Sequence, residues 1–426
     1  MKKIKIAVVG YGNRGQVYAD YSLDEPNEVE VVAVVDPNEY KLIVAKERYG
    51  LSDKNVFTNY SDFVKSGLEV DIVINATMEQ QHYQTAMEIL ASSHNMLIEK
   101  PIVSTEKEIE DIRALAEKNG CMVFVCHVLR YSPFYKTIKK MLSEGEIGKV
   151  VSMEMNEHVW VPHFLTSYGR GKWKSEEECG SPILLAKCCH DMDLICWLNG
   201  DTKPALVSSF GHRSFFTKAN QPKGATEYCY NCPHERKCKF SAIKHYYEND
   251  VMPFLVLDCF NKPYDQITKE EKMEYLKTSD YGKCIFDCGG DVVDRQNLIV
   301  DFEDGRVVAF TLACGTSKPD RYIHVIGTDG EIEGKLEENK FVVRKYDEDK
   351  ICFTERVVDL SSQIVNNAKY GGHSGGDYGI MYDIVRYLNG EKSSQSITLL
   401  SDSIASHKVV YGAEESRKTL KPVAMK

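Results

Sequence analysis

Residues 4–15 read IKIAVVGYGNRG, a mostly apolar run that leads directly into a Gly-x-Gly-x-x-Gly turn. A helical pattern follows, so the local order is strand, glycine turn and helix. Gly10 permits a tight turn, Gly12 lets an anionic group approach the main chain, and Gly15 lets the helix pack closely against the strand. The N-terminus of such a helix presents free N–H groups and a positive dipole end. The stretch therefore predicts a phosphate-binding site.

A second apolar strand, residues 29–35, ends in Asp36, at about the expected 20 residues beyond the glycine turn. An acidic side chain there suits the two ribose hydroxyls of NAD and repels the 2′-phosphate of NADP. The alternative is a glycine turn in an ordinary βαβ unit. We favour an NAD site, because motif, context and spacing agree. The residues expected to contact the cofactor are Gly10, Tyr11, Gly12, Asn13, Arg14, Gly15, Asp36, Thr77, Glu99 and Lys100.

The composition narrows the class of protein. The chain has 426 residues, which predicts two or three domains, and its net charge of −10 argues against binding to nucleic acid or an anionic membrane. No apolar run approaches the roughly 20 residues that a membrane span needs. We therefore expect a cytoplasmic protein whose 14 cysteines are mostly reduced.

The pattern of strands and helices changes near residue 125. Up to that point the two alternate, which predicts an α/β Rossmann domain, residues 1–125, with a doubly wound parallel sheet. Residues 126–426 contain clustered strand patterns and fewer helices, among them one expected helix over residues 184–198. This half predicts an α+β domain with a mostly antiparallel sheet.

Polar clusters follow three strands of the first domain, at residues 77–79, 99–101 and 127–130. Strand C-terminal ends face the ligand crevice of a doubly wound sheet. Lys100, between a glutamate and a proline, is therefore a candidate for chemistry, and the alternative is an exposed lysine at a strand end. His127 and Arg130 are candidates for substrate contact.

A cysteine-containing insertion is expected at about residues 225–290. It begins with a Cys-x2-Cys-x5-Cys pattern, which brings three thiolates within reach of one ion. We expect structural zinc held by Cys229, Cys232, Cys238 and Cys284. Cys288 and His234 are less favoured as the fourth ligand. Iron–sulfur ligation and unpaired reduced cysteines are the alternatives.

Several stretches together resemble the glucose–fructose oxidoreductase / inositol dehydrogenase (Gfo/Idh/MocA) family. They are residues 8–15, 98–101, 145–150, 190–193 and 326–332. The resemblance implies a Rossmann domain, a second domain whose open sheet mediates a dimer or tetramer, and NAD(P)-dependent chemistry at a sugar or cyclitol hydroxyl. It also implies that Lys100 is the catalytic lysine and His190 the general acid/base.

One position departs from the family pattern. Ala186 stands where an aspartate often precedes the histidine, so Lys187 or Asp191 takes over part of its role. On an uninterrupted helix, Lys187, His190 and Asp191 share a face.

Two polar, glycine-rich stretches, residues 167–173 and 371–378, are expected to shape the substrate pocket. Basic side chains beside aromatic faces in the first predict an anionic sugar. The alternative for both is a capping or hinge loop. The candidate substrate residues in these stretches are Arg170, Lys172, Trp173, His373 and Asp377.

The favoured interpretation is an NAD-dependent oxidoreductase that acts on a secondary hydroxyl of a small carbohydrate, sugar derivative or cyclitol. The alternative is an NAD-dependent glycoside hydrolase that works by transient sugar oxidation, elimination, water addition and re-reduction, without net redox. A second alternative is a dinucleotide-binding protein without catalytic activity.

Overall fold

The computed structural model describes residues 1–363 and 373–425. Its N-terminal sheet has six parallel strands in the order β3-β2-β1-β4-β5-β6, the order of a doubly wound dinucleotide-binding domain. The prediction for this half of the fold is confirmed. The strands are β1 Ile4–Val9, β2 Val29–Val35, β3 Val56–Phe57, β4 Ile72–Asn75, β5 Met96–Ile98 and β6 Val123–Val125.

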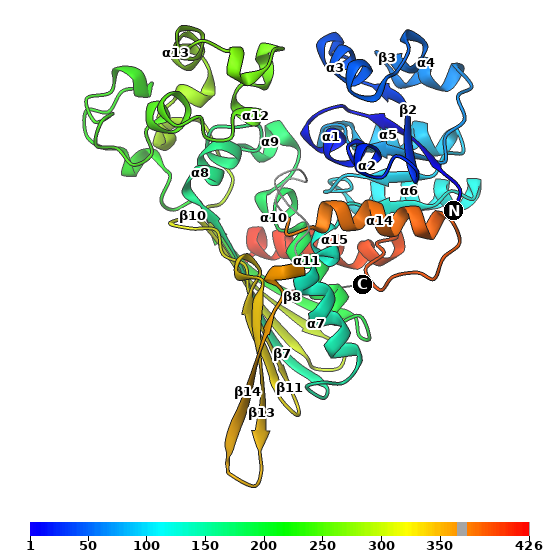
Figure 1. The fold of residues 1–426 in the computed structure, drawn as a ribbon. Coiled ribbons are helices and arrows are strands. Elements are labelled where there is room, and N and C mark those ends of the chain that lie inside the picture. Colours follow the sequence, from blue (N-terminus) through cyan, green and yellow to red (C-terminus); the bar gives the residue numbers. More distant parts are fainter. Residues whose placement is uncertain (364–372, 426) are drawn as a thin grey trace.

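Helices cover both faces of this sheet (Figure 1). Their ends follow local signals: the Asn38 side chain accepts hydrogen bonds from the first turn of α3, and Thr105 and Glu108 form a capping box on α6. The helices of this region are α1 Asn13–Ala19, α2 Tyr21–Asp24, α3 Glu39–Tyr49, α4 Tyr60–Lys65, α5 His82–Ala91 and α6 Glu106–Asn119.

The second sheet has nine strands in the order β14-β13-β12-β11-β7-β10-β9-β8-β15. Among the described strands of this second sheet, only the pair β7 and β10 is parallel. The prediction of a mostly antiparallel sheet is therefore confirmed. Figure 1 shows β13 and β14 projecting as a two-stranded arm. The strands are β7 Val150–Trp160, β8 Pro204–His212, β9 Arg295–Phe302, β10 Val307–Thr316, β11 Tyr322–Gly327, β12 Glu331–Lys335, β13 Lys340–Asp347, β14 Cys352–Asp359 and β15 Val423–Ala424.

One face of the nine-stranded sheet packs against α7 (Pro133–Ser143), α11 (Cys189–Leu198) and α15 (Leu400–Thr419) in one large apolar core. The opposite face carries exposed apolar side chains, including Phe210 and Ile299. The sheet therefore has one buried and one open face.

The C-terminal part of the chain returns to the Rossmann domain. Helix α14 (Gly376–Leu388) buries Ile380 and Ile384 in the same core as Val8 of β1. The N–H of Val125 in β6 donates to the Thr398 carbonyl at 2.9 Å. Packing of the first domain thus depends on residues some 250 positions downstream of its last strand.

The helix expected over residues 184–198 is interrupted. It forms α10 (Ile183–Ala186) and α11, separated at Lys187 and Cys188. In a continuous helix the Ala186 carbonyl would accept from the N–H of His190, but here it accepts from Nζ of Lys100 at 2.9 Å. The prediction of one helix was wrong because a lysine from the other domain takes this carbonyl.

The insertion lies between β8 and β9, residues 213–294, and forms a separate lobe of short helices and loops (Figure 1). It has its own apolar core, which includes Ile243, Tyr246 and Leu276. Its longest described helix is α13 (Lys269–Thr278). Over the described ranges of the chain, no helix combines the length and apolar character needed to cross a bilayer.

We predict that Ile384→Ala lowers the free energy of unfolding by about 2–4 kcal/mol, because it leaves a cavity between α14 and the Rossmann sheet. Ile384 is 1% exposed. Ile43→Ala on α3 is the matched control, since Ile43 is 53% exposed and should cost less than about 0.5 kcal/mol. Urea denaturation measures both, and equal effects would contradict the packing of α14 described above.

Candidate active site

The glycine turn has the shape that a pyrophosphate needs. Gly10 has φ +88°, and a Cβ there would lie 2.5 Å from the Ala76 carbonyl oxygen. A Cβ at Gly15 would collide with the Gly10 carbonyl. A Cβ at Gly12 would meet no described atom within 4 Å. Glycine is therefore required at 10 and 15 by packing, while the open space over Gly12 and the start of α1 suits a bound dinucleotide.

Asp36 lies buried at the end of β2 and is held in place by the turn. Its Oδ2 accepts from the N–H of Tyr11 at 2.8 Å, and its Oδ1 accepts from the N–H of Asn38 at 2.9 Å. The carboxylate thus stands directly beside the glycine turn, as expected for a residue that accepts from ribose hydroxyls. The residues present fit NAD.

Other expected cofactor contacts have different roles. The Tyr11 ring is fully buried, and its hydroxyl donates to Tyr49, so only its main chain reaches the cleft. Arg14 is engaged by carboxylates, as described next. Thr77 donates from Oγ1 to Asn75 at 2.8 Å, and Asn13 opens α1 as an exposed residue. The side chains of Tyr11 and Arg14 are held by other parts of the protein, so the cofactor contacts predicted for these two residues would come from their main chain.

A cluster of buried charges joins the two domains. Arg14 donates from Nε to Glu99 at 2.6 Å and pairs through Nη2 with Asp377 of α14, also at 2.6 Å. Tyr18 donates to Glu99 at 2.6 Å. Burial opposes ionisation of Asp377, but Arg14 and His373 outweigh it and lower the pKa of this carboxyl well below its usual range. Asp377 in turn pairs with Nδ1 of His373 at 2.7 Å.

Lys100 and His190 lie in the same region of the cleft. The N–H of Lys100 donates to Glu99 Oε2 at 2.8 Å, the Lys100–Pro101 peptide bond is cis, and Nζ reaches the Ala186 carbonyl. The His190 ring centre lies 6.0 Å from that of His127 and 5.9 Å from that of His373.

The surroundings of His190 keep its imidazole ring neutral. Burial first, then the positive charge of Lys100, lowers its pKa well below the usual histidine value. Nδ1 has no hydrogen-bond partner within the described part of the chain. A neutral imidazole with a free nitrogen beside an ammonium group is able to take a proton from a hydroxyl.

Lys187 and Asp191 belong to a second charge cluster, with Glu157 of β7 and Arg321. Lys187 Nζ lies 3.3 Å from Glu157, and Arg321 lies 2.5 Å from Glu157 and 2.9 Å from Asp191. Burial, with Glu157 nearby, raises the pKa of Asp191 to about 6. Sequence reasoning missed Glu157 and Arg321. A glutamate in an otherwise apolar strand register was a usable signal for the first, whereas nothing local marks the second.

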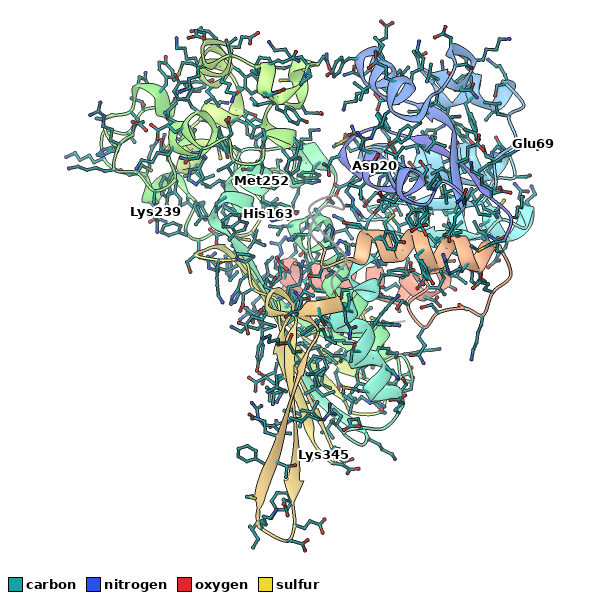
Figure 2. The ribbon with its side chains drawn as sticks, in the orientation of Figure 1. Asp20, Glu69, His163, Lys239, Met252 and Lys345 are labelled. Carbon is teal, nitrogen blue, oxygen red and sulfur yellow. The ribbon has the colours of Figure 1, made fainter. Side chains whose placement is uncertain are left out.

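His163 of α8 (Val161–His163) is a further residue that sequence reasoning missed. Burial, and then the positive charges of Lys187, Arg321 and Lys100, lowers its pKa well below the usual histidine value. Figure 2 shows His163 where the insertion lobe meets the centre of the molecule. Its ring centre lies 5.8 Å from that of Tyr168. His163 therefore borders the region that Lys100 and Lys187 share.

His127 and Arg130 are interior residues. Arg130 pairs with Asp193 at 2.7 and 2.5 Å, and its exposed fraction is 2%. His127 is fully buried, and neither ring nitrogen has a hydrogen-bond partner among residues 1–363 and 373–425. Direct substrate contact by Arg130, as predicted, does not agree with this geometry, because its guanidinium neutralises a buried carboxylate.

The three predicted substrate residues in the stretch 167–173 lie in different surroundings. Arg170 is 1% exposed and donates to the carbonyls of Lys283 and Phe240 at 2.7 and 2.8 Å, so it stabilises the insertion. Lys172 is partly exposed and lines a cavity with Asn38. The Trp173 ring packs 6.2 Å from that of Tyr168. The Arg170 guanidinium is thus occupied by main-chain carbonyls of the insertion, and the predicted contact of this residue with substrate stays a prediction.

The stretch 371–378 is described only from residue 373. Gly371 and Gly372 lie outside the described residues. His373 and Asp377 face Arg14 and His190, so they belong to the site region.

The cysteine cluster gives no support to zinc or to an iron–sulfur centre. Cys229, Cys232, Cys238 and Cys284 line one cavity of about 20 Å³. No group of three or more His, Cys, Asp or Glu side chains in the described ranges is arranged to hold a metal ion. Cys229 donates from Sγ to the Lys283 carbonyl at 3.7 Å and lies 3.8 Å from the Arg170 guanidinium. Burial raises the pKa of the Cys238 thiol.

The two domains are hydrogen-bonded to each other at two separate places. Near the end of β5, Ser104 donates to the Gly180 carbonyl at 2.6 Å, and Ser181 donates to Glu79 at 2.9 Å. Near Asp36, Asn38 donates to Asn261 of the insertion at 2.7 Å. The expected path of the dinucleotide therefore runs between two contacts.

Comparison with known proteins agrees with this geometry. Residues 4–127 match the model of the Gfo/Idh/MocA oxidoreductase family with an NAD-binding Rossmann fold, and residues 139–425 match that of its C-terminal α/β domain. The chain belongs to this family. Its members are NAD(P)-dependent oxidoreductases, so the chain is an enzyme of that class.

Relatives within the family are distant. YteT of Bacillus subtilis, named only as an oxidoreductase, is 22% identical over 93% of this chain and 91% of its own length. An inositol 2-dehydrogenase/D-chiro-inositol 3-dehydrogenase of Lactiplantibacillus plantarum is 26% identical over 46% of this chain and 53% of its own. An Agrobacterium radiobacter oxidoreductase, solved with NAD+, L-tartaric acid and magnesium, has a TM-score of 0.70 at 14% identity, covering 100% of this Gfo/Idh/MocA chain and 99% of that one.

Four histidines whose pKa is lowered in the folded protein predict acid sensitivity. Burial lowers the pKa of His127, His163, His190 and His407, that of His407 to about 3. Their unfolded pKa is about 6.5, so the unfolded state binds more protons below that pH. Their stabilisation is present above about pH 6.5 and is lost as the pH falls toward the folded pKa values.

We predict that His127→Phe flattens this dependence by up to about 1.4 kcal/mol per pH unit between pH 6 and 5, because it removes one such group. Exposed His212→Gln is the control. Urea denaturation over a pH series measures the slope. A wild-type slope in both variants would show that His127 does not carry the effect.

Proposed function

We propose that this enzyme oxidises a secondary hydroxyl of a neutral polyhydroxylated substrate, a sugar or cyclitol, with NAD as acceptor. The observation that carries the proposal is the approach of Lys100 and His190 at the C-terminal edge of the Rossmann sheet. The inositol dehydrogenase among the relatives supports the substrate class.

The proposed chemistry divides between these two residues. Bound NAD supplies a nicotinamide ring that accepts a hydride. Lys100 keeps two N–H groups after its bond to Ala186, and these donate to the substrate hydroxyl oxygen and stabilise the developing negative charge. Neutral His190 accepts the hydroxyl proton. His373, fixed by Asp377, borders His190 and is a proposed substrate contact.

The charge balance supports a neutral substrate. Lys187 is paired with Glu157, and Arg321 is paired with both Glu157 and Asp191, which leaves little net charge in that cluster. Arg170 and Lys172, the basis for expecting an anionic sugar, do not lie beside His190. We therefore propose that Lys187 and Asp191 position the substrate pocket through Glu157 and Arg321.

A second function, glycoside cleavage through transient oxidation, is favoured by the bridges over the cofactor cleft. A redox-neutral cycle needs a cofactor that stays bound, and contacts at both ends of the cleft favour retention.

The deciding experiment incubates the enzyme and NAD with panels of polyols, free sugars and aryl glycosides. NADH that accumulates in proportion to product supports the dehydrogenase. Aglycone release without NADH supports the glycosidase. Neither signal on any panel member would contradict both proposals.

We predict that Lys100→Met lowers kcat by about 10²- to 10⁴-fold, because it removes the group that stabilises the alkoxide, and leaves NAD affinity within about threefold. His190→Asn should lower kcat over the same range. Lys107→Met on α6 is the control, since that side chain is 83% exposed. Retention of more than half of the wild-type kcat by the Lys100 variant would contradict the assignment.

We also propose a homo-oligomer in which the open face of the nine-stranded sheet is covered. Phe210, Ile299 and Val307 share that face and are 59%, 52% and 39% exposed. A row of exposed apolar groups across the adjacent strands β8, β9 and β10 marks an association surface.

We predict that Ile299→Glu dissociates the oligomer, because a buried unpaired charge is costly at an apolar interface. Light scattering after gel filtration measures the mass, with exposed Ile43→Glu on α3 as the control. A mass unchanged from that of the wild-type oligomer, or a monomeric wild type, would contradict this interface.

A further inference from the structure

The tip of the insertion reaches the Rossmann domain beside the expected adenosine site. Asn261 accepts from the Asn38 side chain at 2.7 Å, and Asp258 pairs with Lys41 Nζ at 3.2 Å. Asn38 is two residues beyond Asp36 and donates its own N–H to that carboxylate. The contact is therefore adjacent to the group expected to hold the ribose.

This tip, residues 258–261, is called the latch below. Val256 and Leu257, which directly precede it, are each 2% exposed in the core of the insertion. Asn261 has φ +50°, a left-handed conformation that asparagine tolerates better than most residues. The position of the latch is thus set by packing of the insertion, and only its end extends to the Rossmann domain.

A cavity of about 520 Å³ lies beside the latch. Both domains line it, with Asn38 on one side and Lys172, Lys174, Asp258, Asn261 and Asp280 on the other. The segment that carries the two lysines continues to residues 178–181, which contact Glu79 and Ser104 near the end of β5. The second domain therefore forms a wall along the C-terminal edge of the Rossmann sheet, and the latch is its contact at the adenosine end.

We propose that the latch closes the adenosine end of the cofactor cleft and limits the rate at which the dinucleotide enters and leaves. This inference rests on the proposed function, because the ligand is the same NAD. The Lys41 and Asp258 side chains are 19% and 34% exposed, so their ion pair is weak enough to break repeatedly and is screened by salt. Opening requires loss of two polar contacts and no rearrangement of either core.

The test measures the dissociation rate of NADH by stopped-flow fluorescence, with excess NAD as the displacing ligand. The double variant Asp258→Ala/Asn261→Ala should release NADH roughly tenfold faster, since two polar contacts are lost. Lys41→Ala removes the same ion pair from the Rossmann side and should match Asp258→Ala alone. Glu270→Gln, an exposed change in α13, is the control and should leave the rate unchanged.

Salt provides a second readout. The wild-type release rate should rise with added KCl, and this rise should be smaller in Asp258→Ala, because the screened ion pair is already absent. An unchanged release rate in the double variant would overturn the latch while leaving the proposed function intact. Failure of the wild-type protein to bind NADH would instead overturn the proposed function, and the latch with it.

Discussion

The ion pairs of Arg14 with the buried carboxylates of Glu99 and Asp377 constrain the whole site. They come from α1, the end of β5 and α14, which lie far apart in the sequence. A buried charge without its partner is strongly destabilising, so the cluster fixes these elements relative to one another. The same Glu99 accepts from the N–H of Lys100, and the same Asp377 holds His373. One ionic cluster thereby positions groups on both sides of the cleft.

The interruption at Lys187 follows from the same arrangement. Because Lys100 takes the Ala186 carbonyl, α11 starts anew at Cys189 and carries His190 toward the Rossmann domain. Asp191 then meets Arg321 on the other side. Ala186, which stands in place of the family's aspartate, thus contacts Lys100 through its main-chain carbonyl. The neighbouring Asp191 belongs to a cluster in which positive and negative side chains balance each other. The bond from Lys100 is therefore also a contact between the domains.

The first domain was predicted well because the residues that form its glycine turn and its acidic strand end are close together in the sequence. The place of Asp36 and the need for glycine at 15 follow from contacts within one βαβ unit, whereas glycine at 10 is required by the Ala76 carbonyl after β4. The surroundings of the Tyr11 and Arg170 side chains were not predicted, because they come from distant segments. The Tyr11 hydroxyl meets Tyr49, and Arg170 is enclosed by residues 240 and 283, so no pattern around either residue reveals its burial.

The central claim is that the glycine turn delivers a nicotinamide ring to Lys100 and His190. The most direct measurement is a crystal structure of the enzyme with NAD and a polyol. The account predicts the adenosine ribose on Asp36, the pyrophosphate over Gly12, and the substrate hydroxyl within hydrogen-bond distance of Lys100 Nζ and a His190 ring nitrogen. A nicotinamide ring directed away from Lys100, or a hydroxyl held only by other side chains, would contradict it.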